Sequence, residues 1–467
     1  MRSPTAGDEG SRVGLPIRAP AVGAGVVTNG QAMDADARRH VEAVWSEINE
    51  DELRQLVVEM VNTASPTGDE GALASHLAAL MEGAAIESRV QPIDDRQSNA
   101  VGRLEGTGDG PSLLLYAPVD TVLVGNGDED QPWAGTPRPD MTAAATVDGP
   151  YVIGLGASNP KGHAACILGA LFAVRRAGIP LRGELLAGFG AGGMPTNSRP
   201  ASLGGRRNTG QGVGCSFMLE QGVWPDCAVI VKPGWSVAHE EVGLCWFEIE
   251  VGGTHTYVGS RHRLAYRNAI NDAGFVVARL EAWFEEWAAL HEGGLVRPQG
   301  VVGHIEGGWR RMPSFTTAVC RILVDLRISP RTSPADARCQ LEDALAAIAQ
   351  DRPGLKLRCR MVLSIPGSHS EAEAFVVTST VRGWEEVTGS VHQVTVGTSG
   401  ATDANILRNR GIPTARVGMP KVVDAPFDVD FEMGMNTVDV HAMVELTRVL
   451  AFVAVDTCSR ERGEVVP

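Results

Sequence analysis

The sequence predicts an α/β protein with a mostly parallel sheet, helices on both faces, and an inserted α+β domain. Short, mainly apolar runs at residues 112–116, 184–189 and 227–231 are typical of strands buried on both faces. Helical stretches lie between these runs, and parallel strands need such crossover connections. Near residue 240 the pattern changes to alternating, half-exposed strands, which indicates the second domain.

The helices of the α/β part follow from apolar residues at helical spacing. One helix is expected over residues 34–62, and a turn at 65–68 precedes another that opens near Glu70. A helix rich in small residues is expected at 161–177, where it packs closely against the sheet. The last helix is expected at 440–457.

The inserted domain has its own order of elements. Strands are expected at 246–251, 300–305 and 314–328, and amphipathic helices at 268–287 and 333–350. They predict a strand–helix–strand–strand–helix–strand unit. The expected divisions are a flexible tail at 1–33, an α/β catalytic domain at 34–238 and 362–467, and a lid at 239–361.

Composition excludes some classes of partner. A chain of 467 residues is too long for one ordinary core, so two domains are expected. The net charge of −15 argues against nucleic acid or an anionic membrane as the main partner. The sequence contains no apolar run of about 18 residues, so no membrane-spanning helix is expected. The eight cysteines form no CxxC pair, which indicates reduced thiols and a cytoplasmic protein.

Several short motifs follow one another in a characteristic order. They are residues 65–71, residues 113–116 followed by Asp120, residues 154–158 followed by Lys161-Gly162, residues 251–255 with Asn268, residues 325–327 and residues 399–404. This order resembles the metallopeptidase-like amidohydrolases that include acetylornithine deacetylase, succinyl-diaminopimelate desuccinylase, aminoacylase and glutamate carboxypeptidase. The resemblance implies a zinc-peptidase-like α/β domain, a ferredoxin-like lid that pairs two copies, and a small acidic substrate.

The resemblance also implies the positions of ligands for two zinc ions, and other residues occupy most of them. The first histidine is replaced by Pro118, although the orienting aspartate remains as Asp120. The bridging aspartate is Asn159, and a later carboxylate is Lys232. The adjacent glutamates fall in residues 190–193, which are glycine and alanine. A neutral amide bridges cations poorly and an ammonium repels them, so no metal cofactor is predicted.

Lys232 is the main catalytic candidate, because it follows a strand whose carboxyl end faces the predicted site. Its charge could bind a substrate carboxylate or stabilise an oxyanion, and a lowered pKa would make it a base or nucleophile. The alternative is an ion pair with Asp120 or Glu432 that fills an emptied site. Glu432 or its neighbour Met433 corresponds to the family's C-terminal histidine.

The lid supplies further candidates through the resemblance. His255 matches the histidine that reaches into the partner's active site; the alternative is a surface residue. Asn268 is either a substrate-binding residue or a helix cap. Arg310 and Arg311 either clamp an acidic ligand or are solvated loop charges.

The remaining candidates lie near the α/β site. His163 is either an acid–base group or a packing residue. Asn159 and Asp120 are expected in the pocket because their loops form it. The turn Ser399-Gly400-Ala401, which Thr402 and Asp403 follow, could hold a carboxylate on backbone N–H groups, or be only a tight connection.

Three hypotheses about function follow. The first is a metal-independent enzyme that cleaves an amide, ureido or related C–N bond of a small acidic molecule. The second is a non-catalytic carboxylate-binding protein. The third is a metalloenzyme with relocated ligands, drawn from Asp120, His163, Glu220, His239 and Glu432. The resemblance predicts a homodimer in each case.

Overall fold

The computed structural model describes residues 33, 35–196 and 206–466. These residues form a six-stranded sheet, a four-stranded sheet and two small sheets. Within the described ranges, no helix combines the length and the apolar character needed to cross a membrane. The predicted tail, residues 1–33, lies outside the description except for Met33.

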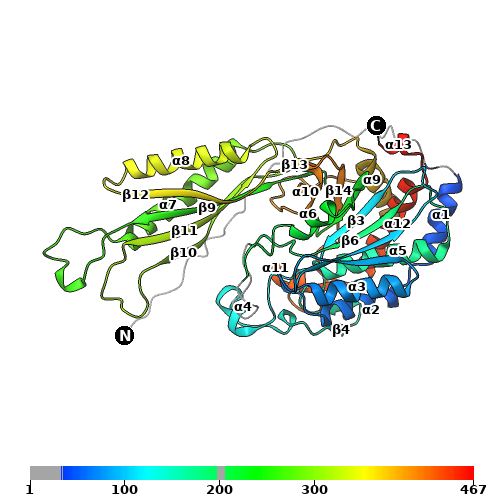
Figure 1. Ribbon diagram of the computed structural model, residues 1–467, viewed down its shortest axis with the longest axis horizontal. Helices are drawn as coiled ribbons and strands as arrows, with labels where there is room; N and C mark the ends of the chain where they lie inside the picture. The colour runs from blue at the N-terminus through cyan, green and yellow to red at the C-terminus, as the bar shows by residue number, and fades with distance from the viewer. Residues whose placement is uncertain (1–32, 34, 197–205, 467) are drawn as a thin grey trace, which may run out of the picture. The chain divides into compact units, whose positions relative to one another are not determined.

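The six-stranded sheet has the order β1-β2-β6-β3-β7-β14 (Figure 1). Its strands are β1 (Glu87–Pro92), β2 (Ser98–Leu104), β3 (Leu113–Pro118), β6 (Leu185–Gly190), β7 (Cys227–Val231) and β14 (Thr414–Val417). The four strands from β6 to β14 are parallel, whereas β1 and β2 pair antiparallel at one edge. The predicted fold class is confirmed, with a mixed sheet.

Both faces of this sheet are buried. Alternate residues of β3 enter two separate cores: Leu113 and Leu115 belong to one, and Leu114 and Tyr116 to the other. The helices around the sheet are α3 (Gly71–Gly83), α5 (Lys161–Ala177), α6 (Val213–Glu220), α9 (Phe375–Thr388), α10 (Ala404–Asn409) and α12 (Val440–Cys458). Helix α12 packs against α5 and α9, and α6 and α10 contribute to the other core (Figure 1).

The single helix predicted over residues 34–62 is wrong, because the chain forms two helices there. They are α1 (Ala35–Ser46) and α2 (Glu50–Asn62). Asn49 between them is extended, and its side chain accepts the Glu52 N–H at 3.0 Å. An asparagine cap of this kind ends one helix and begins the next. The helix predicted at 161–177 is confirmed by α5.

The four-stranded sheet is antiparallel, with the order β10-β11-β9-β12. In chain order its elements are β9 (Gly243–Gly252), α7 (Ala269–Leu290), β10 (Gln299–Gly307), β11 (Val319–Ile328), α8 (Pro334–Gln350) and β12 (Lys356–Ile365). Apolar residues of α7 and α8 share one core with this sheet. The predicted strand–helix–strand–strand–helix–strand unit is confirmed, although β11 begins at Val319 rather than at residue 314.

Several short helices and strands lie outside the two main sheets. They are η1 (Pro139–Met141), α4 (Gly127–Ala134), α11 (Phe431–Asn436), α13 (Arg462–Val465), η3 (Val258–Ser260), the sheet β15 (Thr437–Asp439), β5 (Tyr151–Ile153) and β4 (Thr146–Asp148), and the pair β8 (Glu240–Glu241) and β13 (Ser368–His369). Asn436, at the end of α11, accepts the Gly156 N–H at 2.8 Å and so holds the loop before α5.

Candidate functional site

Asp120 lies just beyond the carboxyl end of β3 and is fully buried. One carboxylate oxygen accepts the Gly193 N–H at 2.8 Å. The other accepts the Met194 N–H at 2.9 Å and the Thr67 hydroxyl at 2.7 Å. Three donors therefore stabilise its charge and fix the turn after β6, where the resemblance places the adjacent glutamates.

Glu70 is a second buried carboxyl at this turn, and no sequence pattern indicated a role for it. Its Oε1 accepts the N–H groups of Gly68 and Gly192, each at 2.9 Å. Its Oε2 has no hydrogen-bond partner among the described residues. Burial, and then the charge of Asp120, raises the pKa of Glu70 to about 8. Three consecutive N–H groups, from Gly192 to Met194, thus point at two carboxyl groups.

Lys232 follows β7 directly and is only 7% exposed. Its Nζ donates to Oδ1 of Asn159 at 3.4 Å. Burial lowers the pKa of Lys232, and the charges of Asp120 and Asp403 oppose this shift. The structure therefore places the lysine beside the residue that matches the family's bridging ligand.

Asn159 begins the segment that leads into α5, and its peptide bond to Pro160 is cis. Its N–H donates to the Met435 carbonyl at 3.0 Å. With Met194 and Glu432, it lines a cavity of about 60 Å³. Among the described residues the Asn159 side chain makes no hydrogen bond besides that with Lys232, so its amide nitrogen can donate to a ligand.

Glu432 lies on α11 and is held by Arg138, with Oε2 3.1 Å from Nη1. The same guanidinium binds both carboxylate oxygens of Asp140, at 2.9 and 3.0 Å. Glu432 therefore lines the cavity as an already paired carboxylate, and Arg138 is its described ion-pair partner.

His163 points both ring nitrogens at backbone groups. Its Nδ1 is 2.7 Å from the Ser158 carbonyl, and its Nε2 accepts the Met419 N–H at 3.2 Å. Complete burial lowers its pKa to about 3, so the imidazole is neutral at pH 7. This geometry favours the packing interpretation of His163 over an acid–base role.

The turn at Ser399, Gly400 and Thr402 forms hydrogen bonds with the buried acid Glu241. Glu241 accepts the Thr402 N–H at 3.0 Å and its hydroxyl at 2.6 Å. Ser399 donates its hydroxyl to the Arg297 carbonyl at 2.6 Å. The carboxylate expected at this turn is thus that of Glu241, which no sequence pattern indicated.

Asp403, next to that turn, is a further buried acid near Lys232. Its Oδ2 accepts the Tyr116 hydroxyl at 2.6 Å. Burial raises the pKa of Asp403 to about 7, while the Tyr116 hydrogen bond and the Lys232 charge lower it. The sequence motif at residues 399–404 contains Asp403, but its hydrogen-bond partner Tyr116 lies 287 positions away in the chain.

The lid candidates lie outside this group. His255 is exposed, its Nδ1 is 3.0 Å from the Thr316 carbonyl, and its ring stacks on Phe315. Asn268 caps α7 by accepting the Ile270 N–H at 3.1 Å. Arg310 and Arg311 are exposed. Among the described residues, none of these four candidates contacts Lys232, Asn159 or Asp120.

The donors present do not fit a pair of zinc ions. In the described part of the chain, no group of three or more His, Cys, Asp or Glu residues could hold a metal. Asp120 has both oxygens engaged, Asn159 offers a neutral amide, and Lys232 carries an ammonium. Of the proposed relocated ligands, Glu220 pairs with Arg410 at 3.2 Å and His163 binds backbone groups.

Comparison with known proteins agrees with the observed fold. No protein-family model matches the chain. Human carnosine dipeptidase 1 superposes with a TM-score of 0.65 at 13% identity, covering 91% of this chain and 100% of that one. An M20 family metallo-carboxypeptidase from Sulfolobus solfataricus gives 0.61 at 14% identity, covering 87% and 99%. The fold is that of the M20 peptidases.

One further solved structure and one relative found by sequence are also similar to this chain. A dinuclear metal-binding peptidase of the M20 family from Bacillus subtilis gives a TM-score of 0.57 at 14% identity, covering 88% of this chain and 98% of that one. The N-formyl-4-amino-5-aminomethyl-2-methylpyrimidine deformylase of Bacillus subtilis (strain 168) is 23% identical over 388 residues, which is 78% of this chain and 84% of the deformylase. The predicted resemblance is confirmed.

Proposed function

We propose that the chain cleaves an amide or related C–N bond of a small carboxylate-bearing molecule without a metal pair. Peptidases share its fold, and a deformylase is similar in sequence over most of its length. The observation that carries the proposal is Lys232, a buried ammonium 3.4 Å from Asn159 at the carboxyl ends of parallel strands.

Lys232 and Asn159 provide two donors for a carbonyl oxygen. Because Oδ1 of Asn159 accepts from Lys232, its amide nitrogen is directed elsewhere and can donate to the substrate. A cation and an N–H group together stabilise the negative charge that develops when an amide carbonyl is attacked. Burial strengthens this electrostatic effect because the local dielectric constant is low.

Asp120 would act as a positioning residue in this reaction. Its oxygens already accept hydrogen bonds from the turn after β6 and from Thr67. Its charge opposes the lowering of the Lys232 pKa by burial. The proposed role of Asp120 is therefore to favour the charged form of Lys232.

The proposed assembly is a cytoplasmic homodimer formed through the four-stranded sheet. Strand β10 is an edge strand whose Val301 and Ile305 are 49% and 48% exposed. A second copy would cover this apolar surface. His255, Arg310 and Arg311 are exposed on the same part of the chain, where they could contribute to the partner's site and bind the substrate carboxylate.

A non-catalytic carboxylate-binding protein is the second candidate. The specific observation in its favour is that the polar groups around Lys232 are largely engaged: Asp120 by three donors, His163 by two backbone groups, and Glu432 by Arg138. All three side chains are therefore engaged within the chain, which favours binding without catalysis.

The test compares Lys232→Met with Lys356→Met. Lys356 is an exposed lysine of β12, so its replacement controls for the loss of one positive charge. With a panel of N-formyl amines, N-acyl amino acids and dipeptides, we expect Lys232→Met to lower kcat/KM by about 10²–10³-fold. We expect Lys356→Met to leave it unchanged.

Chelation distinguishes the remaining hypotheses. We expect full activity after dialysis against a chelator. Loss of activity that zinc or manganese restores would contradict metal independence. Binding of acylated amino acids without turnover, weakened in Lys232→Met, would support the non-catalytic candidate.

A further inference from the structure

Arg416 of β14 is a second cation beside Lys232. It lies opposite Ile230 of β7, and the pairing of the two strands continues with the Lys232 N–H, which donates to the Val417 carbonyl at 3.1 Å. Because successive side chains of a strand point to opposite faces, Arg416 and Lys232 leave the same face of the sheet. Besides burial, the charges of Lys232 and Arg416 lower the pKa of His163, so both cations lie near this one imidazole.

The contacts of the Arg416 guanidinium within the chain leave donors for a ligand. Its Nη2 donates to the carbonyl of Pro233, the residue after Lys232, at 2.6 Å. Its Nη1 is 3.5 Å from Oε1 of Glu241, whose other oxygen accepts the N–H and the hydroxyl of Thr402. A guanidinium carries more N–H groups than these two contacts use, and Nε has no partner among the described residues.

A ligand can reach these donors from outside. The Arg416 side chain is 16% exposed, and its Nε is not enclosed by protein atoms, in contrast to the unpartnered Nη1 of Arg408. Two glycines border the guanidinium. Outside the adjoining residues, the nearest described atom to a Cβ placed at Gly400 is Nη1 of Arg416 at 3.8 Å, and at Gly234 it is Nη2 at 4.0 Å. The side chains that these glycines lack therefore leave space beside Arg416.

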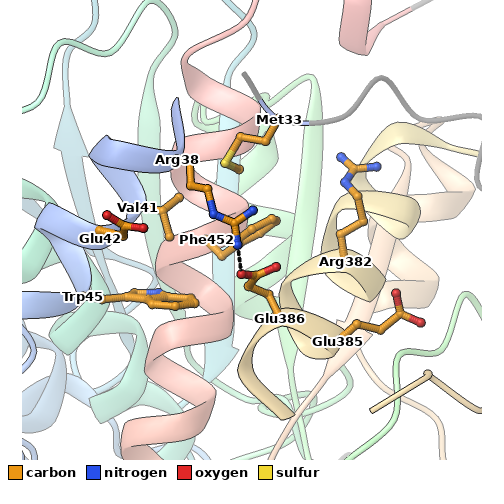
Figure 2. A pocket seen from close by; sticks show the side chains of 9 residues that line it. All are labelled: Met33, Arg38, Val41, Glu42, Trp45, Arg382, Glu385, Glu386 and Phe452. Carbon is orange, nitrogen blue, oxygen red and sulfur yellow. Dashed lines mark hydrogen bonds and ion pairs between the residues drawn. The ribbon is translucent and has the colours of Figure 1, made fainter. Parts of the chain in front are cut away.

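The pocket of about 330 Å³ between α1, α9 and α12 offers no comparable cation (Figure 2). Its Arg38 is paired with Glu386, and the unpartnered Nε and Nη1 of Arg382 are enclosed by the protein. An anion in that pocket would have to compete with Glu386 for Arg38. The carboxyl ends of β7 and β14 are therefore the better place for an anionic ligand.

We infer that Arg416 binds the α-carboxylate of the substrate, and that the substrate is an N-acyl α-amino acid with a free carboxylate. This inference deepens the proposed function and rests on it for the position of the reacting carbonyl at Lys232 and Asn159. In such a molecule only the amide nitrogen and one carbon separate the scissile carbonyl from the carboxylate, so the two groups suit neighbouring cations. The planar fork of an arginine matches the carboxylate.

The carboxylate is then recognised by the chain that also supplies Lys232. The exposed lid residues Arg310 and Arg311 are the alternative source of this recognition. The two sources differ in which substitution removes the preference for a free carboxylate, and this difference can be measured.

The experiment measures equilibrium binding by calorimetric titration of the full chain, so it does not need turnover. The probes are ketone analogues of N-acetylglycine, N-acetyl-L-leucine and N-acetyl-L-phenylalanine, in which a CH₂ group replaces the amide N–H. The carboxamides of the same molecules are the matched ligands without a carboxylate. We expect the tightest-binding acid to bind about tenfold or more tighter than its carboxamide, because hydrogen bonds between charged groups are strong.

Arg416→Gln should remove most of this preference for the acid. Arg416→Lys should reduce it, because an ammonium keeps a charge beside Glu241 but lacks the planar fork. The preference is a ratio within one preparation, so a partial loss of folded protein affects both ligands alike. Arg358→Gln, at an exposed arginine of β12, should retain the wild-type ratio.

The inference is overturned if no acid binds, if acid and carboxamide bind the wild type equally, or if Arg416→Gln keeps the wild-type ratio. It is also overturned if the double substitution Arg310→Gln and Arg311→Gln removes the preference and Arg416→Gln does not. Binding with the expected ratios, without hydrolysis of the matching N-acetyl amino acid, would support the carboxylate site and contradict only the proposed reaction.

Discussion

At the scale of single residues, the site is dominated by buried groups whose charge depends on their neighbours. Two of the four lysines in the sequence, Lys161 and Lys232, are buried, whereas Lys356 and Lys421 are exposed. Glu70, Asp120, Glu241 and Asp403 are buried acids in the same part of the fold. Burial raises the pKa of an acid and lowers that of a lysine, so stability should depend on pH.

Glu70 provides the first such prediction. Its pKa is about 8 in the folded chain and 4.5 ordinarily, so between these values the folded chain retains a proton that the unfolded chain has lost. This contribution to stability is complete below about pH 4.5 and is lost as the pH rises through 8. We expect Glu70→Gln, which keeps an acceptor for Gly68 and Gly192, to lose less stability over this range in urea unfolding.

Glu70→Ala is the contrasting variant. It removes the acceptor of two buried N–H groups, so we expect a loss of about 1–3 kcal/mol for each group left unpaired, at every pH. Parallel pH profiles for wild type and Glu70→Gln would show that Glu70 does not hold the proton.

Lys161 has the opposite pH dependence. Its Nζ donates to the Thr63 carbonyl at 2.9 Å, and burial lowers its pKa from 10.5 to about 7. Between these values the unfolded chain binds more protons, so stability should rise with pH, by at most about 1.4 kcal/mol per unit. We expect Lys161→Met to flatten this rise in urea unfolding from about pH 7.5 to 9.5. Lys356→Met should retain the wild-type slope; a wild-type slope in Lys161→Met would refute the assignment.

At the scale of elements, helix ends explain several polar residues, one of which, Asn268, also had a functional interpretation. Asn49 separates α1 from α2, Ser333 forms a capping box with Asp336, and Asn268 caps α7. Each satisfies a backbone N–H that has no partner within its helix. An asparagine at such a position can be important without touching a substrate.

Asn268 allows this explanation to be tested. We expect Asn268→Ala to lower the free energy of unfolding by about 1 kcal/mol, and Asn268→Ser to restore most of it, because serine is also a good cap. If Asn268 binds substrate instead, Asn268→Ser should have native stability but a raised KM. Chemical unfolding and steady-state kinetics on the same preparations distinguish the two roles.

At the scale of the whole molecule, the assembly and the chemistry are linked. If the chain forms a dimer through its four-stranded sheet, a charge on the exposed edge should separate the copies. We expect Ile305→Lys to halve the mass measured by light scattering, and Val147→Lys, at an exposed valine of β4, to leave it unchanged. A wild-type monomer would remove the cross-protomer role proposed for His255.

The fold class, several helices of the α/β part and the order of elements in the inserted unit follow from local patterns. A continuous apolar run predicts β7, and small residues at helical spacing predict α5. Both predictions succeed because the hydrophobic periodicity that reflects burial is visible in residues close together in the sequence. The break at Asn49 was missed, since the apolar spacing continues across it and only the cap conformation shows the interruption.

The partners of individual polar atoms depend on segments far apart in the chain. Lys232 and Asn159 are 73 positions apart, and Glu241 meets Thr402 across 161. No local pattern shows that His163 binds two backbone groups or that Glu70 shares a turn with Asp120. Residue types alone could therefore indicate a site with altered donors, whereas the packing of strands and loops decided which donors face one another and how burial changes their pKa values.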